Sequence, residues 1–377
     1  MKKNSKLIFA VALLISTIAW VPGLSSAADT IKIGVYLPMT GAVAAYGDME
    51  WAGIQIAGEM EPQALDRKIE LILEDTKSDK IDAANAVTLL IEKYKVSAII
   101  GEAISGNTMA GNPISEAAKI PSVAPVATNP LVNQGKKYAF RACFVDPFQG
   151  EVGARFAYNN LKARTAAVII DTAQDYCVGL GNYFIKEFER LGGKIVSKTF
   201  IQTGDQDFSA QLSAVQGAKP DIIYAPNYYT EDALMAKQAR DLGINLPILT
   251  GDGAQADTLL QIGGSAVEGM YFTGHFHKEA AATERAKEFI KRYEEKYKKS
   301  ADAFGALGAD GYFLLVDAIN RAGSTDGTKI RDALASTKDF QGVSGVMTMG
   351  PEGNPIKSMV INKVQNGKFV YVTTINP

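Results

Sequence analysis

Six polar or aromatic residues each follow a short apolar run of strand type and come just before a helix-like stretch. They are Tyr46, Ser105, Thr128, Tyr176, Tyr228 and Asp252. Hydroxyl groups at a helix N-terminus can hold an anion, and a carboxylate can hold a cation. In open α/β sheets, ligands bind beyond the carboxyl ends of the strands, where helix N-termini supply free N–H groups. Three of these positions fall in each half of the chain, which predicts two lobes that face one ligand.

Each of these residues also has a purely structural interpretation. Ser105 can act as a helix N-cap, and Thr128 and Asp252 can be turn residues, because Asn-Pro follows the first and glycines flank the second. The three tyrosines can be core or rim aromatics. The strand-end positions shared by all six favour the ligand site.

The strand-type runs that position these residues alternate with helical stretches. In the first half the runs are residues 31–37, 98–101 and 121–125, and in the second half they are residues 166–171, 221–225 and 247–250. Alternation of this kind indicates βαβ units and a parallel sheet. Because the pattern restarts near residue 166, we predict an α/β fold with two Rossmann-like, doubly wound parallel-sheet lobes. Two long helices (281–298 and 306–322) and a hairpin turning at Asn366-Gly367 are expected after them.

The segment 1–28 has the layout of a secretory signal peptide. Lys2, Lys3 and Lys6 precede an apolar run, and small residues end it at Ala27 and Ala28. A membrane anchor needs about 20 apolar residues, which is more than this run has. No cysteine lies near the cleavage site to carry a lipid. We therefore expect export to the periplasm as a soluble protein that is not a lipoprotein.

Composition and motifs argue against nucleic acid and against catalysis. Loss of the three leader lysines moves the net charge from −2 to −5, so there is no basic excess to neutralise phosphates. The chain has no P-loop and no G-x-S-x-G motif, and His275 and His277 are too few ligands for zinc. We predict a polar hinge loop for these histidines, no cofactor, no metal and no enzyme. An exported hydrolase is the alternative from another class.

The two cysteines leave two interpretations open. Cys143 and Cys177 can form a disulfide in a compartment that permits one, or they can be two small buried hydrophobic residues.

A resemblance to a known family runs along nearly the whole mature chain. The motifs, in order, are "IKIGVYLPMTGAVAAYGDMEWAGIQIA", "IIGEAISGNT", "PSVAPVATNP", "FRACFVDPFQG", "DTAQDYCVGLG", "GDQDFSAQL", "PDIIYAPNYYTE", "LTGDG" and "VEGMYFT". They resemble the periplasmic leucine/isoleucine/valine-binding proteins, the substrate-binding subunits of branched-chain amino-acid ABC importers. The resemblance implies a type I periplasmic binding protein, with two lobes that close like a Venus flytrap around a three-strand hinge.

The same resemblance implies where the lobes begin and end. The first lobe would comprise residues 29–146 and 276–349, and the second lobe would comprise residues 147–275 and 350–377. The hinge crossings would lie near residues 144–148, 273–277 and 348–354.

The family's ligand contacts can be carried over residue by residue. Ser105 and Thr128 would hold a carboxylate, within a turn that includes Ala127, and the Val126 carbonyl would face the ammonium. Asp252 would bind the ammonium with Tyr228, although one member of the family carries Glu at the position of Asp252. The implied pocket walls are Tyr46, Tyr176 and Tyr228, with Phe304 as a further candidate. Two departures alter the side-chain pocket: Ala103 replaces a larger apolar residue, and Ile104 stands where the relative has a cysteine.

These matches imply a monomer that binds a free amino acid, aliphatic or branched-chain, and delivers it to a membrane permease. The alternative within the same fold is a receptor or sensor for an amide, a urea-type compound or an aromatic carboxylate. Such a ligand has no ammonium, and it would leave Asp252 without a partner.

Overall fold

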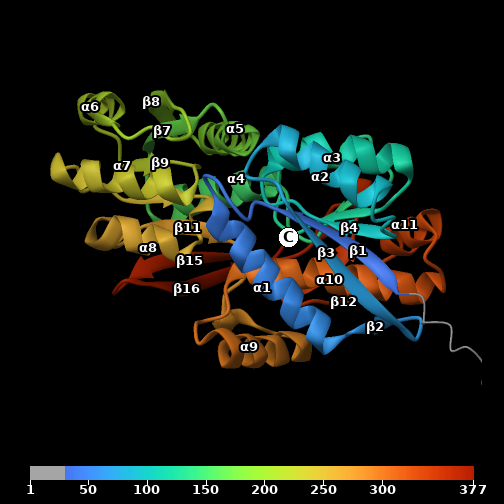
Figure 1. The fold of residues 1–377 in the computed structure, drawn as a ribbon. Helices are drawn as coiled ribbons and strands as arrows, with labels where there is room; N and C mark the ends of the chain where they lie inside the picture. Colours follow the sequence, from blue (N-terminus) through green and yellow to red (C-terminus); the bar gives the residue numbers. More distant parts are fainter. Residues whose placement is uncertain (1–29) are drawn as a thin grey trace, which may run out of the picture.

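The computed structural model describes residues 30–377, so the predicted signal peptide lies outside the described residues. Two β-sheets lie side by side in this part of the chain, each with helices on both faces (Figure 1). This confirms the predicted α/β architecture of two parallel-sheet lobes. None of the helices in residues 30–377 combines the length and apolar character that crossing a bilayer needs.

The first sheet has six strands in the order β2-β3-β1-β4-β5-β6. They are β1 (Ile31–Leu37), β2 (Gln63–Ala64), β3 (Arg67–Asp75), β4 (Ala98–Ile100), β5 (Ser122–Ala124) and β6 (Ala139–Arg141). All pairings are parallel except the short β2–β3 pair. The central strand β1 is buried except at Lys32, as expected for a parallel strand covered on both faces.

Helices cover both faces of this first sheet. They are α1 (Ala44–Met60), α2 (Lys80–Glu92), α3 (Ser105–Ala118), α9 (Glu284–Tyr297), α10 (Ala303–Ala322) and α11 (Gly327–Ala335). α2 packs against α3 on one face, and α1 packs against α10 on the other. α2 begins where the Asp79 carboxylate caps the N–H groups of Ile81 and Asp82, and it buries Val87 and Leu90 on one side. Local sequence therefore fixes both the start of this helix and the face that it buries.

The second sheet has seven strands in the order β16-β15-β11-β10-β9-β7-β8. They are β7 (Thr165–Asp171), β8 (Lys194–Ile201), β9 (Ile222–Tyr224), β10 (Ile248–Thr250), β11 (Tyr271–Gly274), β15 (Met359–Gln365) and β16 (Lys368–Ile375). β7 to β11 are parallel, and β15 and β16 extend the sheet as an antiparallel hairpin. Asn366 and Gly367 both have positive φ, of 54° and 66°. Positive φ at both central residues is typical of a two-residue hairpin turn, so the predicted turn is confirmed.

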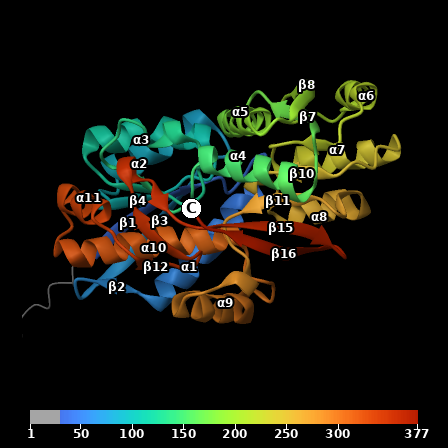
Figure 2. The same ribbon diagram turned by 180° about the vertical axis from the view of Figure 1, so that it is seen from behind.

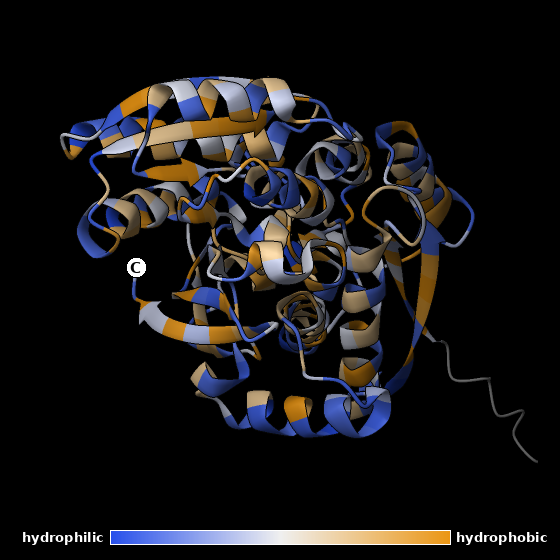
Figure 3. Cartoon of the chain, turned by 90° about the vertical axis from the view of Figure 1, so that its left-hand side faces the viewer, coloured by the Kyte–Doolittle hydropathy of each residue, from blue (hydrophilic) through white to orange (hydrophobic). Residues whose placement is uncertain are grey.

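The helices of the second sheet lie around it in Figures 1 and 2. They are α4 (Asp146–Arg155), α5 (Asp175–Arg190), α6 (Ser209–Ala218), α7 (Tyr229–Asp241) and α8 (Asp257–Gly263). Shorter helical turns complete the described part of the chain: η1 (Pro130–Val132), the π-helical η2 (Phe156–Asn160), η3 (Asp252–Ala254), η4 (Gly264–Val267), η5 (Lys278–Ala280) and η6 (Pro351–Gly353). In Figure 3 the strands carry mostly apolar colour, while the outer sides of many helices are hydrophilic.

The chain passes between the two sheets three times: after β6, after β11 and again before β15. A small third sheet, β12 (Phe340–Gln341), β13 (Val346–Met349) and β14 (Pro355–Ile356), precedes the last passage. Because β14 still pairs with β13, and η6 lies against β6, the last passage falls at residues 357–358. The lobe boundaries themselves stay a prediction.

Candidate ligand-binding site

The carboxyl ends of strands from both sheets meet at one small cavity. Its lining comes from both halves of the chain: Tyr46, Ala103, Ser105, Val126, Thr128, Tyr176, Tyr228, Asp252, Gly253 and Phe304. All six strand-end residues singled out in the sequence are among them. The cavity has a volume of about 10 Å³. A space of this size holds no more than one ordered water.

Two of the residues predicted for the site do not line this cavity. The Ala127 carbonyl accepts hydrogen bonds from Arg141 Nη1 at 2.7 Å and from Cys143 Sγ at 3.3 Å, so it faces away from the site. Ile104 is buried as the N-cap residue of α3. The structure therefore supplies no direct ligand contact for either residue.

The first-lobe wall carries the N-terminus of α3. Ser105 is the first residue of that helix, and its side chain does not cap it. Ser105 Oγ instead accepts the N–H of Asn129 at 3.2 Å. Because a hydroxyl can accept and donate at once, its own proton is left free for an anion beside the helix N-terminus. The N-cap interpretation of Ser105 is therefore wrong.

The second-lobe wall carries Asp252, which is 2% exposed. Its Oδ1 accepts from Gln149 Nε2 at 2.7 Å and from Tyr176 Oη at 2.8 Å, and its Oδ2 lies 2.9 Å from His275 Nε2. A carboxylate offers about four lone-pair sites, so Oδ2 can accept one more donor. Asp252 is thus a buried acceptor held in place from three sides.

The charge state of this group follows from its neighbours. Burial alone would raise the pKa of Asp252, but the positive charge that His275 carries when protonated and the hydrogen bonds from His275, Gln149 and Tyr176 together lower it below its usual range. Burial also lowers the pKa of His275, against the opposing influence of Asp252. At neutral pH the pair is therefore a carboxylate beside a neutral imidazole, and the wall presents negative charge.

Four of the remaining lining residues are aromatic. Tyr176 and Tyr228 are stacked with centroids 5.6 Å apart, and Tyr46 meets Tyr228 edge-on, also at 5.6 Å. Phe304, at the start of α10, lies 4.6 Å from the ring of Tyr46. This places the predicted wall residue at the cavity. Apolar side chains of a ligand would be surrounded by these rings.

The two lobes touch around the cavity. Tyr46 Oη on α1 donates to the carbonyl of Gly253 on η3. Lys80 on α2 forms a 2.8 Å ion pair with Asp175 on α5, and the Asn129 side chain donates to the Asp175 carbonyl at 2.9 Å. Hydrogen bonds and an ion pair therefore join the two walls that face each other across the site.

Sequence reasoning missed two residues of the site, Gln149 and His275. The prediction of a polar hinge loop is wrong for His275, because its side chain is buried and bonded to Asp252. The sequence did contain a signal for His275. This residue follows the carboxyl end of β11, and the other site residues were selected because they follow strand ends in the same way. Gln149 lies one turn into α4 and carried no comparable signal.

The disulfide left open by the sequence does not form. Cys143 and Cys177 are both free and buried. Cys143 follows β6 and bonds the Ala127 carbonyl, whereas Cys177 packs on α5 of the second lobe. Within residues 30–377, no group of three His, Cys, Asp or Glu side chains is arranged to hold a metal ion.

Comparisons with known proteins agree with this architecture. A model of the periplasmic binding protein family matches residues 30–368. The leucine-, isoleucine-, valine-, threonine- and alanine-binding protein of Pseudomonas aeruginosa is 28% identical over 334 residues, 88% of each chain. The crystal structure of the leucine binding protein LivK from Thermotoga maritima is similar, with 50% identity and a TM-score of 0.91 over 92% of this chain and 99% of that one.

A second solved structure is also similar along its whole length. The branched-chain amino acid transporter substrate binding protein LivJ from Streptococcus pneumoniae, in complex with isoleucine, has 32% identity and a TM-score of 0.88. The match covers 93% of this chain and 100% of that one. The chain therefore belongs to the periplasmic binding protein family, as a type I solute-binding protein of the LivJ and LivK kind.

Proposed function

We propose that the protein binds a free aliphatic amino acid between its two lobes and delivers it to the membrane permease of an ABC importer. The observation that carries this proposal is Asp252, a buried carboxylate with one acceptor site left, opposite the Ser105 hydroxyl and the α3 N-terminus. A zwitterion would pair its ammonium with Asp252 and its carboxylate with the α3 wall.

Binding to both walls explains why closure would depend on the ligand. A buried charge without a partner is costly, so neither lobe alone satisfies a zwitterion. The closed state therefore gains affinity that the open state lacks, and the ligand shifts the equilibrium toward closure. Because the cavity is small, the tyrosine walls must move outward to admit a side chain of leucine's size.

The required affinity is within reach of such a site. Leucine has about nine heavy atoms, and the ceiling for small ligands is about 1.5 kcal/mol per atom. Micromolar binding needs only about 8 kcal/mol.

The family's name, and a relative named as a transporter substrate binding protein, support an extracytoplasmic location and a permease partner. We propose export through the predicted leader, a monomeric state and no catalytic turnover. Incubation with leucine should return the amino acid unchanged.

Calorimetry with a matched set of ligands tests the proposal. Leucine would be compared with 4-methylpentanoate, which lacks the ammonium, and with 3-methylbutylamine, which lacks the carboxylate. We expect leucine to bind at micromolar affinity or tighter, and each truncated ligand at least about 100-fold more weakly, because one wall loses its partner.

A panel of isoleucine, valine, benzoate and small amides would accompany these three ligands. The aromatic lining keeps an aromatic carboxylate as the second candidate. If benzoate or 4-methylpentanoate bound as tightly as leucine, the zwitterion model would be wrong.

A further inference from the structure

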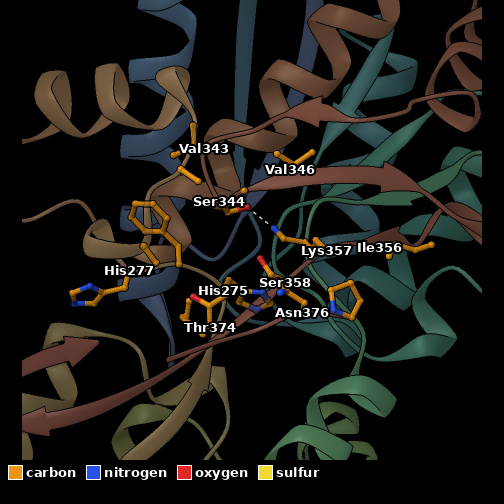
Figure 4. Close-up of a pocket in the computed structure, with 16 residues that line it drawn as sticks. His275, His277, Val343, Ser344, Val346, Ile356, Lys357, Ser358, Thr374 and Asn376 are labelled. Carbon is orange, nitrogen blue, oxygen red and sulfur yellow. Dashed lines mark hydrogen bonds between the residues drawn. The ribbon is translucent and has the colours of Figure 1, made fainter. Parts of the chain in front are cut away.

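His275 lies between the ligand site and a second, larger cavity. Its Nε2 is 2.9 Å from Asp252 Oδ2, and its side chain is fully buried. The imidazole stacks on Phe144, with the ring centroids 3.8 Å apart. Figure 4 shows His275 near Lys357 and Ser358 on the wall of the second cavity, whose volume is about 470 Å³. The ring is thus fixed from both sides, with one nitrogen committed to Asp252.

The other nitrogen has no fixed proton acceptor. Among the described residues, Nδ1 of His275 has no hydrogen-bond partner. The arrangement fits a neutral imidazole that carries its proton on Nε2 and donates it to Asp252. In this form His275 orients the carboxylate without cancelling its charge.

Charged and titratable groups face this pair from several elements. They are Tyr176 from α5, Asp146 from the start of α4, Cys143 from the segment after β6, Lys357 from the segment after β14, Tyr46 from α1, Tyr224 from β9 and Tyr228 just before α7. The buried positive charge of Lys357 has partners of its own. Its ammonium group donates to Ser344, as Figure 4 shows, and to the Ala142 carbonyl at 3.0 Å. The negative charge of Asp310 also acts on it. The positive charge of Lys357 disfavours a second proton on His275.

We propose that His275 is a positioning residue for Asp252, and that capture of a ligand ammonium at Asp252 competes with a second proton on His275. The proposal rests on the proposed function, because it requires a cationic group at Asp252. An imidazolium and an ammonium would have to share one buried carboxylate, and like charges at one site disfavour each other. Binding in acid therefore releases one proton.

The reciprocal effect sets the expected size. If ligand binding expels a proton, the proton weakens ligand binding by the same factor. Affinity for leucine should fall by up to about tenfold per pH unit once the pH is below the pKa of His275 in the free protein. Burial lowers that pKa, so the loss of leucine affinity should occur at acidic pH. Burial raises the pKa of Asp146 to about 8, which places its own titration well above that range.

Calorimetry from pH 4.5 to 7.5 tests the proposal with three variants. His275→Gln keeps an N–H that can reach Asp252 but cannot take up a proton, so binding at pH 7.5 should stay within about tenfold of wild type and the acid fall should flatten. His275→Phe removes the donor, so affinity should drop at every pH. His277→Gln is the matched control, since His277 contacts the Phe369 carbonyl and Glu279 rather than Asp252. It should keep the wild-type profile.

Proton release can be measured in the same experiment. Heats recorded in buffers of different ionisation enthalpy should show one proton released per leucine in acid for wild type, and none for His275→Gln. An unchanged acid profile in His275→Gln would overturn the proposal, as would equal binding by His275→Gln and His275→Phe.

Imidazole NMR separates this inference from the proposed function. The chain has two histidines, so His277→Gln leaves His275 as the only imidazole. In the ligand-free protein, adding Asp252→Asn should lower the pKa of His275 further, because the attractive charge is gone. If wild type bound no amino acid at any pH, the proposed function and the ligand competition would both fail. The ligand-free titration would still decide whether His275 and Asp252 are coupled.

Discussion

Asp252 is the residue on which the site depends most. It is buried, it accepts hydrogen bonds from α4, from α5 and from the end of β11, and its lowered pKa keeps it charged. Its three donors all belong to the second lobe or to the passage after β11. These donors therefore organise the acceptor independently of the first-lobe wall.

Asp252→Asn keeps the size and the acceptor oxygen but removes the charge. We expect leucine to bind at least about 100-fold more weakly, a loss of about 3 kcal/mol, because the ammonium is left buried without a counter-charge. Calorimetry at pH 7.5 would measure it. Asp175→Asn is the control: Asp175 is partly exposed in its pair with Lys80, so the change should stay below about 1 kcal/mol. Equal affinities in the two variants would contradict this assignment.

A second buried acid, Asp146, makes stability depend on pH. Burial raises its pKa to about 8, although Thr128 and Arg141 act in the opposite direction. An unfolded Asp has a pKa of about 3.9, so between about pH 4 and 8 the folded state binds more protons than the unfolded state. This stabilisation is fully present below about pH 4 and is lost as the pH rises toward 8.

We therefore expect the free energy of unfolding of wild type to fall between pH 5 and pH 8, with Glu102, whose pKa burial raises to about 7, adding to the fall. Asp146→Asn should flatten part of this slope, as measured by urea denaturation at several pH values. Asp207→Asn is the control. The N–H of Ser209 lowers the pKa of this exposed acid, so its ionisation should affect the free energy of unfolding only at lower pH. A wild-type slope in Asp146→Asn would show that Asp146 does not titrate as proposed.

At the scale of elements, the close packing of α1 against α10 positions two walls of the site. α1 carries Tyr46 and α10 begins with Ala303 and Phe304. Gly53 lets the helices approach, because a Cβ at this position would overlap the backbone carbonyl of Gly305. The glycine is required here for space rather than for backbone conformation.

Gly53→Ala should destabilise the ligand-free protein by about 1–3 kcal/mol, since a methyl group must be forced between two backbones. Gly58→Ala on the same helix is the matched control: its Cβ would meet only ordinary contacts, with Leu71 Cδ1 at 3.6 Å. This variant should be neutral or more stable by up to about 1 kcal/mol, because Ala favours helix over Gly. Thermal unfolding of both variants checks the difference, and similar losses in the two would refute the packing argument.

At the scale of the whole molecule, a few contacts cross between the two lobes. Tyr46 Oη donates to the Gly253 carbonyl, and Tyr229 Oη lies 3.4 Å from the Ala42 carbonyl. If ligand binding closes the lobes, as we propose, such bonds form on closure and contribute to ligand affinity rather than to the stability of either lobe.

Tyr46→Phe keeps the ring and removes this donor. We expect leucine affinity to fall by about 1–3 kcal/mol, because the Gly253 carbonyl is left unpaired in the closed state. The melting temperature of the ligand-free protein should stay close to wild type if the lobes are open without ligand. Tyr229→Phe, with its longer contact, should have a smaller effect. A large loss of ligand-free stability in Tyr46→Phe would mean that the bond also holds the protein together without ligand.

Much of this molecule could be predicted from local patterns. The run 31–37 coincides with β1, and the five other runs match β4, β5, β7, β9 and β10 closely at both ends. The reason is that strand and helix periodicity are properties of short segments. Ser105 and Thr128 lie close together because parallel strands end at the same edge of a sheet, and Asp252 lies at the corresponding edge of the second sheet.

Partnerships between distant side chains were decided by tertiary packing. Gln149 and Asp252 are 103 residues apart, yet they share a hydrogen bond, and His275 is buried against the same carboxylate although its segment looks polar. Cys143 and Cys177 stay unpaired, one in the segment after β6 and the other on α5, and the Ala127 carbonyl turns toward Arg141. Sequence patterns specify which elements form and where their ends lie. The directions of individual side chains depend on how those elements pack together, and the sequence of a short segment does not determine that packing.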